Sequence, residues 1–153
     1  MHKYISGKIK AAVGFALALL LAFALPHGAN AETIPMLKDL QQIAPNQLKV
    51  TYDQRVDGTK GITPGNYWIQ STTETMPTGI ATLGMNDRVS PGNALTADKV
   101  TITTADTTNT SFILTFKQPI PAGKSYKLII CYVTAPNAPP YSGDNGSREF
   151  TGK

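Results

Sequence analysis

The chain has 153 residues, a mass of 16.4 kDa, a formal net charge of +4 and a charged fraction of 16%. This length allows one domain, and a charged fraction below the usual quarter excludes a disordered polyelectrolyte or a coiled coil. The single cysteine excludes an intrachain disulfide framework and a cysteine-rich zinc site.

The first 31 residues have the pattern of a secretory signal peptide. Three lysines precede residues 11–25, which carry no charge, and Ala29-Asn-Ala31 matches an A-x-A cleavage site. The alternative is a membrane anchor, but a span needs about 20 apolar residues and this run is shorter. We therefore expect residues 1–31 to be removed. Residues 32–153 would then be exported as a periplasmic, secreted or cell-surface protein without a membrane span.

Removal of that segment changes the chemistry of the chain. It takes three of the 14 basic residues and none of the 10 acidic ones, so the net charge falls from +4 to +1. His2 and His27, the only two histidines, leave with it. The remaining chain lacks the histidine of Ser-His-Asp and Cys-His sites, and it has no basic patch for nucleic acid. No spacing of acidic residues selects a carboxylate pair, so we expect a protein that is not an enzyme.

Short alternating runs between Gly, Pro, Asn and Asp clusters predict β-strands throughout the mature chain. In chain order, the expected strands are residues 36–43, 47–52, 66–70, 80–83, 98–104, 110–116, 125–133 and 148–150. The first run also fits a short helix, because Leu37, Leu40 and Ile43 lie at helical spacing. The fourth run is the weakest, and the Pro- and Gly-rich residues 134–147 are expected to form a loop or tail. About seven strands with turns every 8–12 residues predict one antiparallel β-sandwich over residues 32–153.

Three of these segments resemble a known family. They are Asn46-Gln-Leu-Lys-Val-Thr-Tyr-Asp-Gln-Arg-Val-Asp57, the Asn66-Tyr67 pair after Pro64-Gly65, and Phe112-Ile-Leu-Thr-Phe116 with Pro119-Ile-Pro-Ala-Gly-Lys-Ser-Tyr-Lys-Leu-Ile-Ile130. Together they are similar to the bacterial Ig-like domains of S-layer and other surface or secreted proteins. The resemblance runs from Leu37 to about Val133. It implies an Ig-like sandwich that binds protein or builds the cell envelope, with a protein or an envelope polymer as its partner.

Trp68 and Tyr141 are the candidate ligand contacts. Trp68 lies between Tyr67 and Ile69, so it faces outward if those two face the core. An exposed indole there would stack on a sugar ring, with Tyr67 or Tyr141 beside it, which makes a carbohydrate-binding module the alternative function. The competing interpretation, which we favour, packs Trp68 under residues 71–78 or against the other sheet.

We expect no resident cofactor, with calcium as the alternative. The candidate oxygen ligands are Asp53, Asp57, Asp87, Asp98, Asp106, Asp144 and Asn145. They are scattered and form no D-x-D-x-D-G loop, and Asp144-Asn-Gly146 has the composition of a turn. Met76 and Met85 without histidine do not indicate a copper site. Cys131 lies in an apolar run and is expected to be buried; if it were exposed, it would be free to form an intermolecular disulfide.

Overall fold

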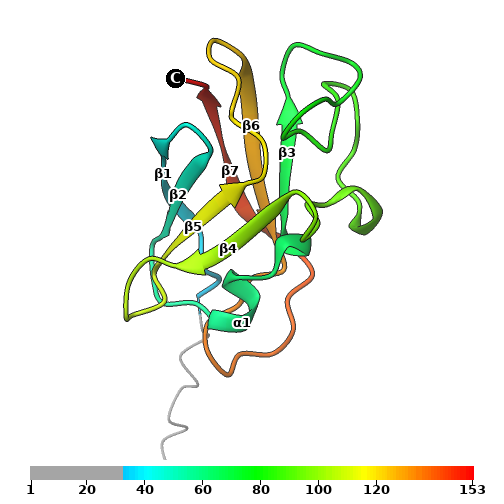
Figure 1. Ribbon diagram of the computed structural model, residues 1–153. Coiled ribbons are helices and arrows are strands. Elements are labelled where there is room, and N and C mark those ends of the chain that lie inside the picture. The colour runs from blue at the N-terminus through cyan, green and yellow to red at the C-terminus, as the bar shows by residue number, and fades with distance from the viewer. Residues whose placement is uncertain (1–32) are drawn as a thin grey trace, which may run out of the picture. The chain divides into compact units, whose positions relative to one another are not determined.

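The computed structural model describes residues 33–153, which form two antiparallel β-sheets packed against each other (Figure 1). The strands are β1 (Leu37–Ala44), β2 (Gln47–Tyr52), β3 (Tyr67–Ser71), β4 (Val100–Thr104), β5 (Ser111–Phe116), β6 (Ser125–Cys131) and β7 (Asp144–Thr151). A single turn of helix, α1 (Gly58–Gly61), and two 3-10 turns, Pro64–Asn66 and Pro91–Asn93, lie between strands. In this part of the chain no helix is long and apolar enough to cross a membrane. The expected signal peptide, residues 1–31, lies outside the described residues.

The strands are neighbours in a definite order within each sheet. One sheet has the order β1-β2-β5-β4, the other β3-β6-β7, and every pair of neighbours is antiparallel. If the seven strands are lettered A to G in chain order, the strand orders of the two sheets are A-B-E-D and C-F-G. Constant-type immunoglobulin domains have the same strand order. The predicted all-β sandwich is confirmed.

The core lies between the inward faces of the two sheets. Leu48 and Val50 of β2 are fully buried and stand opposite Leu114 and Phe112 of β5, as the alternating pattern predicts. The three-stranded sheet contributes the inward side chains of β3 and β6 to the same cluster. The largest of its fully buried members are Tyr52, Tyr67, Tyr126, Phe112 and Phe116.

The first expected strand is confirmed and its helical alternative is excluded, because its backbone pairs with β2 along residues 37–44. Two other expected elements differ from the structure. Residues 80–83 form no strand; they lie along β3, with an isolated bridge between Gln70 and Leu83 and backbone hydrogen bonds to Ile69 and Ser71. The last strand begins at Asp144 and not at Arg148, so it takes up the final residues of the expected loop.

Two buried tyrosine hydroxyls join the sheets to α1. Tyr67 Oη donates to the carbonyl oxygen of Gly61 at 2.7 Å, and Tyr52 Oη lies 2.7 Å from Tyr67 Oη. Because Tyr67 has only one hydroxyl proton, Tyr52 is the donor of that second bond. Gly61 lies against the Phe112 ring, where an added Cβ would come within 2.3 Å of a ring carbon, so only glycine fits. Burial raises the pKa of both phenols well above the ordinary value.

Because both hydroxyls are buried, we expect the free energy of unfolding of the protein to fall in alkali. In the unfolded chain both phenols ionise near pH 10, whereas their raised pKa keeps them neutral in the folded protein. The folded state therefore holds more protons above pH 10, and the free energy of unfolding falls as the pH rises. Urea unfolding between pH 7 and pH 11 measures this slope, and absorbance at 295 nm reports phenolate formation.

Tyr67→Phe should lower the free energy of unfolding at pH 7 by about 1–3 kcal/mol, since it leaves the Gly61 carbonyl and the Tyr52 hydroxyl without their partner. The variant should also show a weaker slope above pH 10. If all tyrosines of the folded wild-type protein titrate together near pH 10, the assignment of a buried neutral pair is wrong.

Candidate functional site

Trp68 occupies the outer face of the three-stranded sheet. Its neighbours Tyr67 and Ile69 belong to the core, and Trp68 points to the opposite side, as its position in the strand predicts. The indole is nevertheless fully buried, because it is covered by Leu83 and Ala94 of the connection between β3 and β4. The ring of Tyr132 also packs edge-on against it, with centroids 5.9 Å apart.

The connection is held over the indole by hydrogen bonds. Trp68 Nε1 donates to the carbonyl oxygen of Ser90 at 3.0 Å and to Asn93 Oδ1 at 2.9 Å. Gln70, the next outward side chain of β3, donates to the carbonyl oxygen of Gly84 at 3.0 Å. An indole with no exposed face has no surface for a sugar ring, so the stacking platform considered for Trp68 does not form. The packed alternative holds, although the cover is residues 83–94 and not 71–78.

Cys131 lies in the same outer cluster and is buried, as predicted. Burial, and then the nearby negative charge of Asp144, raise the pKa of the thiol above its ordinary value. The thiolate is the reactive form, so the folded protein should hold less of it at every pH below that raised pKa.

We therefore expect Cys131 to react slowly with Ellman's reagent at pH 7–8 in the folded protein and rapidly in 8 M urea. The ratio of the two rates should exceed about 100, because both burial and the raised pKa protect the thiol. Stopped-flow absorbance at 412 nm measures both rates. Equal rates would show that the outer cluster is open to solvent.

Tyr141 lies in the loop between β6 and β7, at the end of the sandwich where the described chain begins (Figure 1). It is half-buried, and its hydroxyl donates to the carbonyl oxygen of Asp144 at 3.0 Å. The ring lies over Gly143, where an added Cβ would come within 2.4 Å of the tyrosine oxygen. The hydroxyl end of the ring thus both donates a hydrogen bond and lies close against Gly143.

A cavity of about 280 Å³ opens beside this ring. Among the described residues, its walls are Thr33, Ile34, Thr134, Ala135, Ala138, Pro139, Pro140 and Tyr141. None of these side chains carries a charge, and most are apolar. The cavity therefore suits a neutral, apolar group.

Asn145 anchors the walls of this cavity. Its side chain is completely buried, accepts from the Val133 backbone N–H at 2.9 Å, and donates to the carbonyl oxygens of Val133 at 2.7 Å and Pro35 at 2.8 Å. A β-bulge places it there, because Asn145 and Gly146 together oppose the single residue Ile130 of β6. Gly146 supplies the φ of +100° that the bulge needs.

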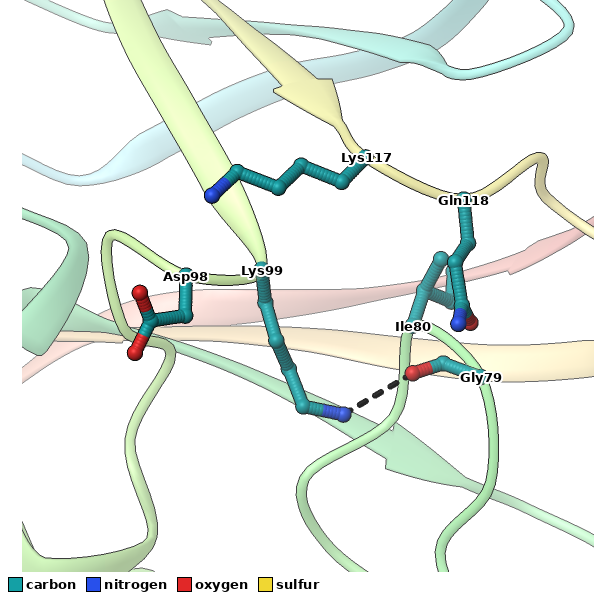
Figure 2. A pocket seen from close by; sticks show the side chains of 6 residues that line it. All are labelled: Gly79, Ile80, Asp98, Lys99, Lys117 and Gln118. Atoms are coloured by element: carbon teal, nitrogen blue, oxygen red, sulfur yellow. Dashed lines mark hydrogen bonds between the residues drawn. The ribbon is translucent and has the colours of Figure 1, made fainter.

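A second, smaller cavity of about 130 Å³ lies beside Lys99 and Lys117 (Figure 2). Lys99 Nζ donates to the carbonyl oxygens of Gly79 at 2.9 Å and Ala81 at 3.4 Å. Figure 2 shows the two lysine side chains pointing apart, with Asp98 turned away from both. The ammonium groups do not converge, so the arrangement forms no cradle for an anion.

The carboxylates considered for calcium are dispersed over the loops. Asp57 Oδ1 accepts from the Lys60 N–H at the start of α1, and Asp87 Oδ2 accepts from the Gly84 N–H. Asp106 Oδ1 accepts from the Thr108 and Thr110 N–H groups, which lowers the pKa of that carboxyl despite partial desolvation. Within residues 33–153 no three carboxylate, histidine or cysteine side chains gather into a metal-binding group. These acids form turns in the loops.

Comparison with solved structures shows that the fold of this chain is similar to that of segments of an S-layer protein. The crystal structure of the S-layer protein rSbsC(31-844) matches 78% of this chain with a TM-score of 0.52 and 16% sequence identity. The N-terminal part of the bacterial S-layer protein SbsC matches with a TM-score of 0.51, and SbsC domains 1–6 with 0.52, both at the same coverage and identity.

The chain spans 14–23% of the length of these S-layer structures. No family model and no curated protein matches it. At 16% identity the S-layer likeness establishes a shared fold and carries no residue-level correspondence for Trp68, Tyr141 or Asn145.

Proposed function

We propose that the mature chain is a non-catalytic Ig-like domain of the bacterial cell surface, where it binds another protein or contributes to the structure of the envelope. The observation that carries the proposal is the fold, whose similarity to segments of an S-layer protein extends over 78% of the chain. The A-B-E-D and C-F-G strand order supports the Ig-like assignment. The sequence resemblance from Leu37 to about Val133 points to the same class of proteins.

Export is the second part of the proposal. The basic start, the apolar residues 11–25 and the Ala29-Asn-Ala31 site support removal of the segment by signal peptidase. The histidine-free sequence that remains supports a binding role over a catalytic one. The carbohydrate-binding alternative has lost Trp68 as its platform, because the indole is buried beneath residues 83–94.

Expression of the full chain in a bacterial host, followed by cell fractionation and mass spectrometry, tests export. We expect a protein that begins at Glu32 and is found outside the cytoplasm, where protease added to intact cells or to spheroplasts digests it. Leu20→Arg interrupts the apolar run and should keep the full-length chain inside the cell. Full-length wild-type protein in the cytoplasm would contradict the proposal.

A further inference from the structure

Asn145 is the only asparagine of the chain that is followed by glycine. An Asn-Gly pair is chemically labile, because the backbone nitrogen of the glycine attacks the side-chain Cγ of the asparagine and no Cβ hinders its approach. The backbone nitrogen gives up its proton, an N–Cγ bond forms, and the Cγ–Nδ2 bond breaks as the amide nitrogen takes up a proton and leaves as ammonia. Water then opens the resulting ring at either of its two carbonyls and leaves aspartate or isoaspartate.

The folded structure opposes ring closure at both reacting groups. The Asn145 side chain is fully buried, and its Nδ2 donates to the carbonyl oxygens of Val133 at 2.7 Å and Pro35 at 2.8 Å. Both bonds are lost when Nδ2 leaves, and burial keeps water from replacing them. The Gly146 N–H donates to Asp144 Oδ1 at 2.6 Å, and a carboxylate beside that nitrogen disfavours the loss of its proton.

The product of the reaction suits this position less well than asparagine does. Aspartate has no N–H to donate, so the carbonyl oxygens of Val133 and Pro35 would face a carboxylate oxygen in a fully buried place. Isoaspartate also adds a methylene group to the main chain at the bulge that sets the register of β7 against β6. Deamidation therefore replaces an anchor of the fold with a group that weakens it.

We propose that Asn145-Gly146 is a deamidation site that is protected in the folded protein and reactive in the unfolded chain. Time spent unfolded then converts the protein to a less stable form, which unfolds again more readily. The reaction needs no reagent except water, and refolding does not reverse it. The inference goes beyond the proposed surface function and is independent of it.

The rate of deamidation in the folded and unfolded protein tests the proposal. The purified protein is incubated at pH 8 and 37 °C with and without 6 M guanidinium chloride, and mass spectrometry of the tryptic peptide of residues 128–148 follows the reaction. We expect Asn145 to react at least about 100-fold more slowly in the folded protein, because the reaction follows the small population in which the bulge is open. Asn137, which alanine follows in the same peptide, should stay largely intact in both samples. Equal rates at Asn145 with and without denaturant would overturn the proposal.

A matched variant separates burial of Asn145 from the reactivity of Asn-Gly pairs in general. Ser142→Asn places a second asparagine before a glycine, at an exposed position of the same peptide. The introduced asparagine should react in the folded variant nearly as fast as in denaturant, whereas Asn145 of the same molecules should react only in denaturant. If the exposed site is protected as well as Asn145, burial and hydrogen bonding of Asn145 are not the cause and the proposal is wrong.

The stability of the product is tested on the aged, unfolded sample after removal of the denaturant. A short protease pulse is given at a urea concentration at which the unmodified protein is still mostly folded. Chains deamidated at Asn145 should be depleted at least about tenfold among the survivors, since proteolysis follows the unfolded population. Asn145→Asp should likewise unfold at lower urea than Asn86→Asp, which changes an exposed asparagine. Equal survival of deamidated and intact chains would show that the product is not weakened.

Discussion

Trp68→Ala should lower the free energy of unfolding by about 4 kcal/mol. The substitution empties the centre of the outer cluster, where Leu83, Ala94 and Cys131 pack around the fully buried indole. Large-to-small changes of a buried tryptophan cost about 3–5 kcal/mol through lost burial and the cavity left behind. Since domains of this size are stable by about 5–15 kcal/mol, the variant would lose a large part of its stability.

The effect should be concentrated in the connection between β3 and β4. Without the indole N–H, the carbonyl of Ser90 and the side chain of Asn93 lose their hydrogen bonds to β3, although the bond from Gln70 to Gly84 remains. The sandwich core is a separate cluster and keeps its contacts. We therefore expect limited proteolysis to cut this connection in the variant well before it cuts any strand.

Urea unfolding followed by circular dichroism at 218 nm is the appropriate measurement, because the variant has no tryptophan left to fluoresce. Met76→Ala is the matched control. Met76 is a large apolar residue of the same connection, but it is 74% exposed, and its removal should change stability by less than about 0.5 kcal/mol. A Trp68→Ala protein as stable as this control would show that the indole is exposed in solution.

The alternation of apolar and polar residues was sufficient to predict the sandwich. In β2 and β5 it placed Leu48, Val50, Phe112 and Leu114 on the inward face, and the structure buries all four. This works because a half-buried strand has a fixed period of two residues, so the pattern determines which side chains enter the core. The same rule gave the outward direction of Trp68 correctly.

The sequence pattern did not indicate what covers the outer face. The cover is formed by residues 83–94, which have no strand or helix periodicity and are held by side-chain bonds from β3 to loop carbonyls. Such contacts join residues that are distant in sequence and leave no local signal. Asn145 was missed for a related reason: Asn-Gly is the usual composition of a turn, whereas here it forms a bulge that turns the asparagine inward.

Asn145→Ala should cost about 3–4 kcal/mol in the free energy of unfolding, although it removes only a few polar atoms. The wild-type side chain satisfies the Val133 N–H and the carbonyl oxygens of Val133 and Pro35, all in a fully buried position. Alanine leaves three backbone groups without partners, and each buried unsatisfied group costs on the order of 1–3 kcal/mol. Water that enters the vacated space would hydrogen-bond some of these groups, so the total loss of stability should lie near the lower end of the range for three such groups.

Urea unfolding of Asn145→Ala beside Asn86→Ala separates this role from a general effect of losing an asparagine. Asn86 is exposed, so its removal should change stability by less than about 0.5 kcal/mol. In the Asn145 variant, the amide signals of Val133, Thr134 and Ala135 should shift or broaden even in the absence of denaturant, because the residues before β1 and the β6–β7 loop lose their common anchor. If instead stability and these signals are both retained, the two segments are joined by contacts other than Asn145.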